Sequence, residues 1–267
     1  MTRILFWNIN RSTSEELISK LCQEKDIDLL ILAENRHRDT VLLPALFSAS
    51  ERAFKNIGEQ TNRCSFYSAL PNPCVVKIRD VNWLTIKHVS PPSGKSFLLV
   101  AIHFASKMYK DTISQAMRTT RIREYIDQAE LEAGHSRTLV VGDFNQNPYE
   151  LGMTDADGLH AVKTKIIASK ENHIVDGLSR KYFYNPMWNL MGDESKGPPG
   201  TYFLQSCEKH VYWHSFDQVL LRPSILDKYK EGDVSIVEKI GDQLLLKNHK
   251  IDTNISDHLP ITVKIRD

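Results

Sequence analysis

Short segments without a polar residue limit the fold of this chain more than any other sequence feature. Leu29–Ala33 and Leu139–Val141 are the clearest of them. A strand with one solvent-exposed face alternates apolar and polar residues, whereas a continuous apolar run is typical of a strand buried on both faces. Two sheets packed face to face, with helices over their outer faces, would bury such strands completely.

The rest of the pattern is rich in β-formers and contains few helices. A strand is predicted over Arg3–Ile9, a helix begins near Ser12, and Asp28–Ala33 completes a β-α-β opening. The longest helical pattern covers Asp111–Glu132. Further strands are expected at 64–70, 74–78, 83–89, 97–104, 138–141, 216–221, 234–240 and 261–265, and the first four of these suggest a meander.

Length and composition fit one globular domain over residues 1–267. The chain is 41% hydrophobic and 25% charged, which excludes disordered and fibrous classes. Its formal net charge of +1 excludes a uniformly basic nucleic-acid-binding surface but not a local basic groove. The four cysteines form no C-x-x-C pair, so a cysteine zinc site is not expected. No secretory signal pattern and no apolar run of about 20 residues is found, so a soluble, cytoplasmic protein is expected.

Polar residues that could carry chemistry share one position in the pattern, since each lies where a strand meets a loop. They are Asn8, Glu34, His103, Asp143, Asn145, Asp217, Asp257 and His258. Any one of them alone is more often a cap or a turn former. Together they supply what metal-assisted hydrolysis of a phosphate ester needs. Carboxylate and amide oxygens bind Mg²⁺, imidazoles donate to phosphate oxygens, and a carboxylate activates water.

Five short motifs in order resemble those of the endonuclease/exonuclease/phosphatase superfamily, which has the deoxyribonuclease I-like fold. Gly142–Asn145 followed by Asn147-Pro148 is similar to its G-D-F-N-x-x-P signature, and Ser256–Pro260 is similar to its closing S-D-H-x-P motif. The other three are Trp7–Asn10, Ala33-Glu34 and Ser215–Leu220. The resemblance implies an α+β fold, a four-layer α/β/β/α sandwich of two mostly antiparallel or mixed sheets with flanking helices.

The resemblance also implies a metal site and a group that activates water. Glu34 would be the principal ligand of Mg²⁺, for which Mn²⁺ is a possible substitute. Asn8 would lie beside Glu34 on the metal or the phosphate, and Asp257 would complete the acidic cluster as a metal ligand. Asp143 would orient and activate the attacking water. Asn145 would hold a phosphate oxygen or the nucleophile.

Two histidines would act on the phosphate. His258 would contact the scissile phosphate, with its ring oriented by Asp217, because a His–Asp pair fixes the tautomer and favours the imidazolium. His103 would protonate the leaving oxygen or stabilise the phosphate. The resemblance pairs His103 with a carboxylate, for which Glu59 and Asp80 are equal candidates.

The substrate that we predict is nucleic acid, with DNA favoured. Arg36 stands in an E-x-R pattern that resembles the deoxyribonuclease I branch, where the arginine reaches nucleic acid, although a solvated charged turn explains it equally well. Asn147 is a second candidate for substrate binding. Val100–Ser106 is also similar to this branch, but many members carry Asn at the position of Ala101.

Two alternatives stay open on the sequence. The same chemistry acts on phospholipids, sphingolipids or small phosphorylated metabolites elsewhere in the superfamily, because a fold does not fix a substrate. A catalytically inactive binding or scaffold protein is the other alternative, and a partner protein for targeting is compatible with each of them. The basic residues after His103 and the aromatic residues between Tyr182 and Trp213 fit nucleic-acid contact or ordinary surface and core positions.

Overall fold

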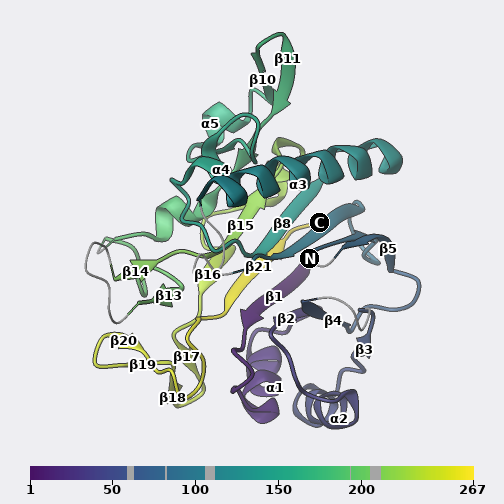
Figure 1. The fold of residues 1–267 in the computed structure, drawn as a ribbon. Helices are drawn as coiled ribbons and strands as arrows, with labels where there is room; N and C mark the ends of the chain where they lie inside the picture. The colour runs from purple at the N-terminus through teal and green to yellow at the C-terminus, as the bar shows by residue number, and fades with distance from the viewer. Residues whose placement is uncertain (59–62, 82, 106–111, 193, 205–211) are drawn as a thin grey trace.

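Two large β-sheets lie between helices in the computed structural model, which describes residues 1–58, 63–81, 83–105, 112–192, 194–204 and 212–267 (Figure 1). One sheet has six strands and the other has seven. Helices cover the outer face of each sheet, so the predicted four-layer α+β sandwich is confirmed.

The six-stranded sheet runs in the order β16-β21-β1-β2-β4-β3. Its strands are β1 (Thr2–Asn8), β2 (Leu29–Ala33), β3 (Lys55–Asn56), β4 (Cys64–Ser68), β16 (Val234–Ile236) and β21 (Ile261–Ile265). β1 and β2 are parallel, with Asn8 opposite Ala33, and the other neighbours are antiparallel. The ends of β1 and β2 and the start of β21 therefore share one edge.

The seven-stranded sheet runs in the order β5-β6-β7-β8-β15-β12-β9. Its strands are β5 (Val75–Val81), β6 (Leu84–Val89), β7 (Phe97–His103), β8 (Thr138–Asp143), β9 (Ala161–Val162), β12 (Phe183–Tyr184) and β15 (Asp217–Leu221). β7 and β8 are parallel and end together, with His103 opposite Asp143. β15 is antiparallel to β8 and begins at the same edge, with Asp217 opposite Asp143.

Three helices form the outer layers. α1 (Glu15–Glu24) and α2 (Asp39–Ser50) cover the six-stranded sheet, and α3 (Thr112–Ala133) covers the seven-stranded sheet. Ser14 caps α1 by accepting a hydrogen bond from the Leu17 N–H. The shorter helices are α4 (Leu151–Thr154), α5 (Lys165–Ala168) and the 3₁₀ turns η1 (Pro186–Leu190) and η2 (Pro223–Lys228).

Alternate residues of each central strand enter different cores. Ile4 and Phe6 of β1 point between the two sheets, whereas Leu5 and Trp7 of the same strand pack under α1 and α2. In β8, Val140 packs on the α3 side, while its neighbours face the space between the sheets. Both faces of these strands are buried, which explains the uninterrupted apolar runs in the sequence.

Some predicted elements were wrong or missing. The segment 64–70 does not begin a meander, because β4 pairs with β2 in the six-stranded sheet and leaves only β5–β7 as the meander. The segment 234–240 is divided between β16 and β17 (Lys239–Ile240). Helix α2 was not predicted, because Pro44 lies inside it and Arg38 provides no side-chain cap.

Four small hairpins extend from the sandwich. They are β10–β11 (Asn172–Val175 and Leu178–Lys181), β13–β14 (Tyr202–Phe203 and Trp213–His214), β17–β18 (Lys239–Ile240 and Gln243–Leu244) and β19–β20 (Leu246–Lys247 and Lys250–Ile251). In the described part of the chain, no helix has the length and apolar character that crossing a lipid bilayer requires.

Candidate active site

Strand ends from both sheets meet at one edge of the sandwich. The six-stranded sheet contributes the ends of β1 and β2 and the start of β21, and the seven-stranded sheet contributes the ends of β7 and β8 and the start of β15. These ends carry Asn8, Glu34, His103, Asp143, Asp217 and His258. Rigid strands thus fix the backbone of each polar group, as active sites require.

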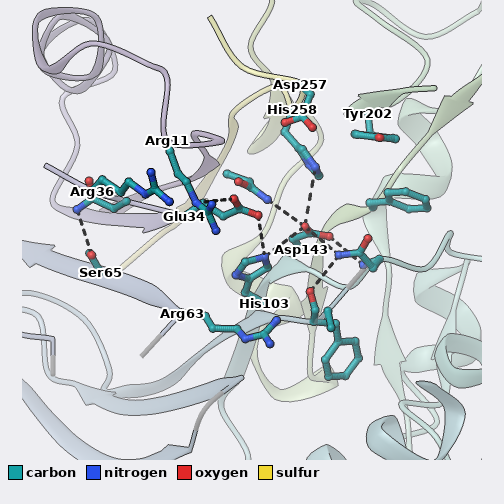
Figure 2. A pocket seen from close by; sticks show the side chains of 16 residues that line it. Arg11, Glu34, Arg36, Arg63, Ser65, His103, Asp143, Tyr202, Asp257 and His258 are labelled. Atoms are coloured by element: carbon teal, nitrogen blue, oxygen red, sulfur yellow. Dashed lines mark hydrogen bonds and ion pairs between the residues drawn. The ribbon is translucent and has the colours of Figure 1, made fainter. Parts of the chain in front are cut away.

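A cavity of about 620 Å³ opens at this edge. Arg11, Arg36 and Arg63 line it, and each of them follows or precedes a strand of the six-stranded sheet. Tyr202 of β13 lies on the opposite side in Figure 2, with Asp143 between the two sides. One wall of the cavity is therefore cationic and the other is aromatic.

The carboxylate of Asp143 is held by three hydrogen bonds. The Asn145 N–H donates to Oδ1 over 2.9 Å, and the side-chain amides of Asn8 and Asn145 donate to Oδ2 over 3.2 and 3.1 Å. The preceding residue must be glycine, because a Cβ on Gly142 would lie 2.0 Å from the Ile102 carbonyl oxygen of β7. The G-D-F-N motif thus places one carboxylate in a fixed orientation.

The environment of Asp143 favours its protonated form. Asp143 is 1% exposed, and burial raises its pKa, as does the neighbouring charge of Asp217. His258 and His103 act in the opposite direction without cancelling the shift. A carboxylate whose pKa is raised accepts a proton more readily than an ordinary aspartate does.

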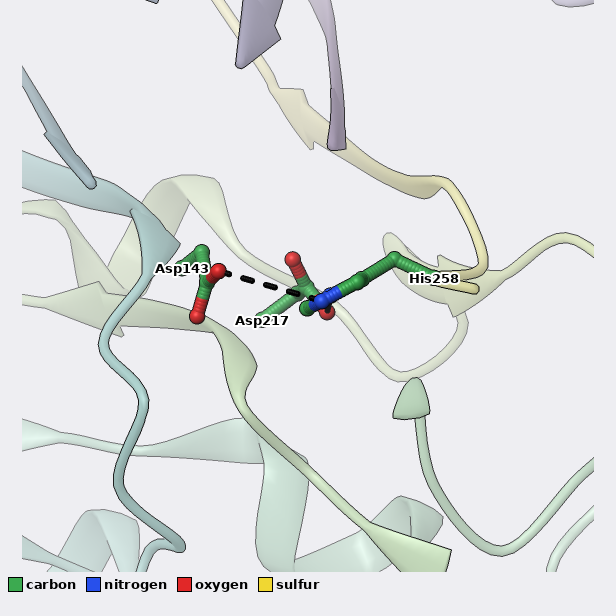
Figure 3. Close-up of side chains that lie close together, drawn as sticks. All are labelled: Asp143, Asp217 and His258. Carbon is green, nitrogen blue, oxygen red and sulfur yellow. Dashed lines mark hydrogen bonds and ion pairs between the residues drawn. The ribbon is translucent and has the colours of Figure 1, made fainter. Parts of the chain in front are cut away.

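His258 and Asp217 form a hydrogen-bonded pair next to Asp143 (Figure 3). His258 Nδ1 lies 2.8 Å from Asp217 Oδ2, and Asp217 is fully buried. Burial acts to lower the pKa of His258, but Asp217 and Asp143 outweigh it and raise the pKa to about 10. The ring is therefore an imidazolium at neutral pH, and its Nε2 lies 3.9 Å from Asp143 Oδ2.

His103 is in the opposite protonation state. Its Nε2 lies 3.7 Å from Glu34 Oε1 and 3.9 Å from Asp143 Oδ2. Burial lowers the pKa of His103; Asp143 opposes this shift, while Arg63 and His258 add to it. At neutral pH the cavity therefore contains one neutral and one protonated imidazole.

Two groups of side chains are candidates for holding a metal ion. Ligand atoms of Asp143, Asp217 and His258 all lie within 4.8 Å of one another. His258 fits that role poorly, because its Nδ1 bonds to Asp217 and a protonated imidazole cannot ligate a metal. Glu34 and Asp257 are only partly buried and line the cavity, so their carboxylates fit a hard cation such as Mg²⁺ better.

Comparisons with known proteins identify the fold. No protein-family model matches the chain, and a search of curated proteins finds no match. An AP endonuclease from Archaeoglobus fulgidus is 13% identical, with 99% of both chains covered and a TM-score of 0.59. Truncated TDP2 from Caenorhabditis elegans is 14% identical over 100% of this chain and 97% of that one, with a TM-score of 0.58. An endonuclease/exonuclease/phosphatase family protein from Leptotrichia buccalis is 12% identical over 100% of both chains, with a TM-score of 0.58. The similarity to these structures shows that the chain has a deoxyribonuclease I-like fold.

The deoxyribonuclease I-like fold brings most of the residues singled out in the sequence to the cavity. Those that line it are Asn8, Glu34, Arg36, His103, Asp143, Asn145, Asp257 and His258. Asp217 lies behind His258, where it contacts the ring and not the cavity. Asn147 lies outside the lining as well, since its Oδ1 accepts the Ser215 N–H and its Nδ2 donates to Glu150. Asn147 therefore holds a loop in place beneath the site.

Asp80, one of the two candidate partners of His103, does not lie beside it. Among the described residues, the carboxylates within 4 Å of His103 are those of Glu34 and Asp143, so Asp80 is not its partner. Glu59 lies in the part of the chain that the structure does not describe. In the part of the chain that the structure describes, the nearest carboxylates of His103 therefore come from β8 and from the loop after β2.

Two arginines of the cavity, Arg11 and Arg63, had no assigned role in the sequence. Arg11 directly follows the W-N-x-x motif, which is the one signal that would have indicated it. Arg63 gave no signal, because only the pairing of β4 with β2 brings it to the cavity. Tyr202 lines the cavity, whereas Phe183 and Tyr184 of the same aromatic-rich region are core residues.

The basic residues after His103 do not line the cavity where the structure describes them. They are Arg118, Arg121 and Arg123 of α3, on the outer face of the seven-stranded sheet. Lys107 and Lys110 fall outside the described ranges. The cationic wall of the cavity therefore comes from the loops around β1, β2 and β4.

Proposed function

We propose that this protein is a Mg²⁺-dependent phosphodiesterase that hydrolyses nucleic acid, with DNA as the preferred substrate. The observation that carries the proposal is the juxtaposition of Asp143, a carboxylate with a raised pKa, and the imidazolium of His258 on the wall of one cavity. A proton acceptor beside a fixed positive charge suits the attack of water on a phosphate anion.

Glu34, Asp257 and Asn8 would hold the divalent cation. The amide oxygen of Asn8 also accepts a hydrogen bond from the Asn10 N–H over 3.2 Å, so Glu34 and Asp257 are the stronger ligands. When bound, the cation would neutralise charge on the phosphate oxygens and lower the pKa of water near it.

Asp143 would orient the attacking water and take its proton. The three amide hydrogen bonds on this carboxylate fix its direction before substrate binds. Among the described residues, the side-chain Nδ2 of Asn145 donates to Asp143 and to the Phe104 carbonyl oxygen, each over 3.1 Å. We assign Asn145 to positioning this carboxylate, with its backbone in the left-handed region at a φ of 49°.

His258 would bind the scissile phosphate through Nε2, since Nδ1 remains on Asp217. Its positive charge would offset the negative charge that grows on phosphate oxygens in the transition state. His103 is neutral, so its Nε2, which lies 3.7 Å from Glu34 Oε1, can donate a hydrogen bond in one tautomer and accept one in the other. Donation to a phosphate oxygen suits a neutral imidazole better than supplying a proton to the leaving group does.

The cationic wall supports a nucleic-acid substrate. Arg11, Arg36 and Arg63 would contact phosphates next to the scissile one, and Tyr202 would face a sugar or base on the other side. Two of the similar structures are those of an AP endonuclease and of the endonuclease domain of TRAS1, a telomere-specific non-LTR retrotransposon. These names agree with a substrate of this class.

A substrate panel tests the proposal. Purified protein with Mg²⁺ is incubated with plasmid, duplex and single-stranded DNA, RNA, phosphatidylcholine, sphingomyelin and small phosphorylated metabolites. We expect cleavage of DNA that stops with EDTA and is lost in Glu34→Gln. Turnover of a lipid or a metabolite without cleavage of nucleic acid would reject nucleic acid as the substrate but would still support metal-dependent hydrolysis of a phosphoester.

The alternative of an inactive binding protein is tested on the same material. Mg²⁺ and Mn²⁺ should raise the melting temperature of the wild type and have less effect on Glu34→Gln, because a ligand that binds only the folded state stabilises it. No shift with either ion, together with no turnover on any phosphoester, would favour a non-catalytic protein.

A further inference from the structure

Arg11 lies at a position that restrains its backbone and leaves its side chain free to move. Asn10 and Arg11 lie one residue beyond the end of β1, after Ile9, and both have left-handed backbone conformations, with φ values of 43° and 61°. The next two residues are tied down, because the hydroxyls of Ser12 and Thr13 donate to the Ile255 carbonyl oxygen over 2.9 and 2.8 Å. The Arg11 side chain is 52% exposed, so only its rotamer needs to change for it to reach another group.

The side chain of Arg11 points to Glu34 (Figure 2). Arg11 Nε lies 3.4 Å from Glu34 Oε2, while Glu34 Oε1 lies 3.7 Å from His103 Nε2. An ion pair of this length between partly exposed side chains is weak, because water competes for both partners. Arg11 is therefore a counter-ion that another cation can replace.

A divalent cation on Glu34 would compete with Arg11 for the same carboxylate. The guanidinium stays charged at every accessible pH, so it would repel a cation bound beside it. Once displaced, Arg11 would remain in the cavity, within reach of an anion on the same cationic wall as Arg36 and Arg63.

We propose that Arg11 is an exchangeable counter-ion of Glu34, which yields this carboxylate to the divalent cation and then binds a phosphate of the substrate. Metal and anion consequently bind with positive coupling, because each of them releases the partner that the other needs. By linkage, the anion tightens metal binding by the same factor as the metal tightens anion binding. The inference rests on the proposed function, since it uses the same cavity and the same cation.

Arg63 provides the matched control. It lines the same cavity and carries the same charge, but among the described residues Glu34 forms an ion pair with Arg11 and not with Arg63. Arg63→Gln therefore removes one positive charge from the cavity and leaves the Glu34 counter-ion in place. Any effect common to Arg63→Gln and Arg11→Gln is a general loss of positive potential.

Calorimetric titration of Mg²⁺, repeated with Mn²⁺, into the full chain tests the proposal without any turnover. We expect Arg11→Gln to bind the cation about fivefold more tightly than the wild type, and Arg63→Gln to show a smaller change. Saturating inorganic phosphate should tighten cation binding by the wild type and have little effect in Arg11→Gln. An unchanged or weaker cation affinity in Arg11→Gln, or equal phosphate coupling in both proteins, would overturn the proposal.

A second variant guards against a folding defect. Arg11→Gly suits the positive φ of this residue and should melt within a few degrees of the wild type, as well as reproduce the affinity of Arg11→Gln. The outcome is separable from that of the proposed function. If both variants bind the cation more tightly but the protein cleaves no phosphodiester, the counter-ion role is supported and the nuclease function is rejected. If the protein cleaves nucleic acid but cation affinity is unchanged in both variants, the nuclease function is supported and the counter-ion role is rejected.

Discussion

Two buried clusters of charged side chains lie at opposite ends of β15. At one end Asp217, the first residue of the strand, contacts His258 beside Asp143. At the other end Arg222 directly follows the strand and contacts Glu130. Both of these ion pairs are buried, but the charges around them are balanced differently.

The Arg222 cluster satisfies its charges. Arg222 is 1% exposed, donates to Glu130 Oε1 over 2.8 Å and to Asp127 Oδ1 over 2.9 Å, and lies over the Phe183 ring. Lys181 donates to the other Glu130 oxygen over 2.8 Å. Burial acts to raise the pKa of Glu130, but Arg222 and Lys181 outweigh it and lower the pKa.

The cluster at the cavity leaves charge uncompensated. Two carboxylates share the single imidazolium of His258, the pKa of Asp143 is raised, and Asp217 Oδ1 has no hydrogen bond to any described residue. Buried charges therefore have two different roles in this fold, one in stability and one in the proposed chemistry. Matched pairs hold the far end of the sheet together, and unmatched ones supply proton affinity where chemistry is proposed.

The largest effect is expected at Asp143. Asp143→Asn should lower kcat on DNA by about 10³-fold, because the amide cannot accept a proton. Its melting temperature should change little, since the substitution keeps the size of the side chain and removes a buried carboxylate whose pKa is raised. Steady-state kinetics and thermal denaturation measure the two effects. Retention of more than about a tenth of kcat would remove Asp143 from the mechanism.

The far cluster should show the opposite pattern. Arg222→Met should cost about 3 kcal/mol of unfolding free energy, because it leaves buried Glu130 without its main partner. The kcat of the folded variant should stay near that of the wild type. Denaturant unfolding gives the free energy, and Arg180→Met, which removes a surface pair with Asp157, is the control with a smaller cost. A fall in kcat as large as that of Asp143→Asn would contradict the division of roles.

Protonation of His258 should affect both the activity and the stability of the protein. His258→Gln should lower kcat by about 10²-fold at neutral pH, because the positive charge on the phosphate is lost. The pKa is raised from 6.5 to about 10 on folding, so the imidazolium stabilises the fold fully below pH 6.5, and this contribution is lost as the pH rises through about 10. The stability difference between wild type and variant should therefore shrink from pH 6.5 to 10 in denaturant titrations. A difference that is constant over this range would show that His258 is not the protonated group.

The smallest effect concerns Glu130. Because its pKa is lowered on folding from an ordinary value of 4.5, it stabilises the fold fully above pH 4.5, and this contribution is lost as the pH falls through the lowered pKa. Glu130→Gln should cost about 1.5 kcal/mol at neutral pH and less in acid. Unfolding of both proteins between pH 3 and 7 measures this convergence, and parallel curves would contradict it.

Sequence patterns predicted the elements that have a distinct pattern of burial. β1, β2, β8 and α3 were found within a few residues, because strands buried on both faces leave continuous apolar runs and a long helix with one buried face repeats apolar residues at helical spacing. α2 was missed because Pro44 interrupts its helical pattern. β4 was assigned to the wrong sheet because the sequence of a short strand does not indicate which strand it pairs with. At the cavity, motif residues such as Asp143 were found, whereas Arg63 depends on a strand pairing that no local pattern records.

The sequence by itself determined which strands carry apolar residues on both faces and which polar groups lie at the strand ends. Those properties are local, since they follow from the side chains of a few neighbouring residues. Only the tertiary structure decided that Arg11 contacts Glu34, that Asn147 lies outside the cavity lining, and that one histidine is protonated while the other is neutral. Each of these depends on burial and on distances between segments far apart in the chain, because a charge responds to all of its neighbours in space.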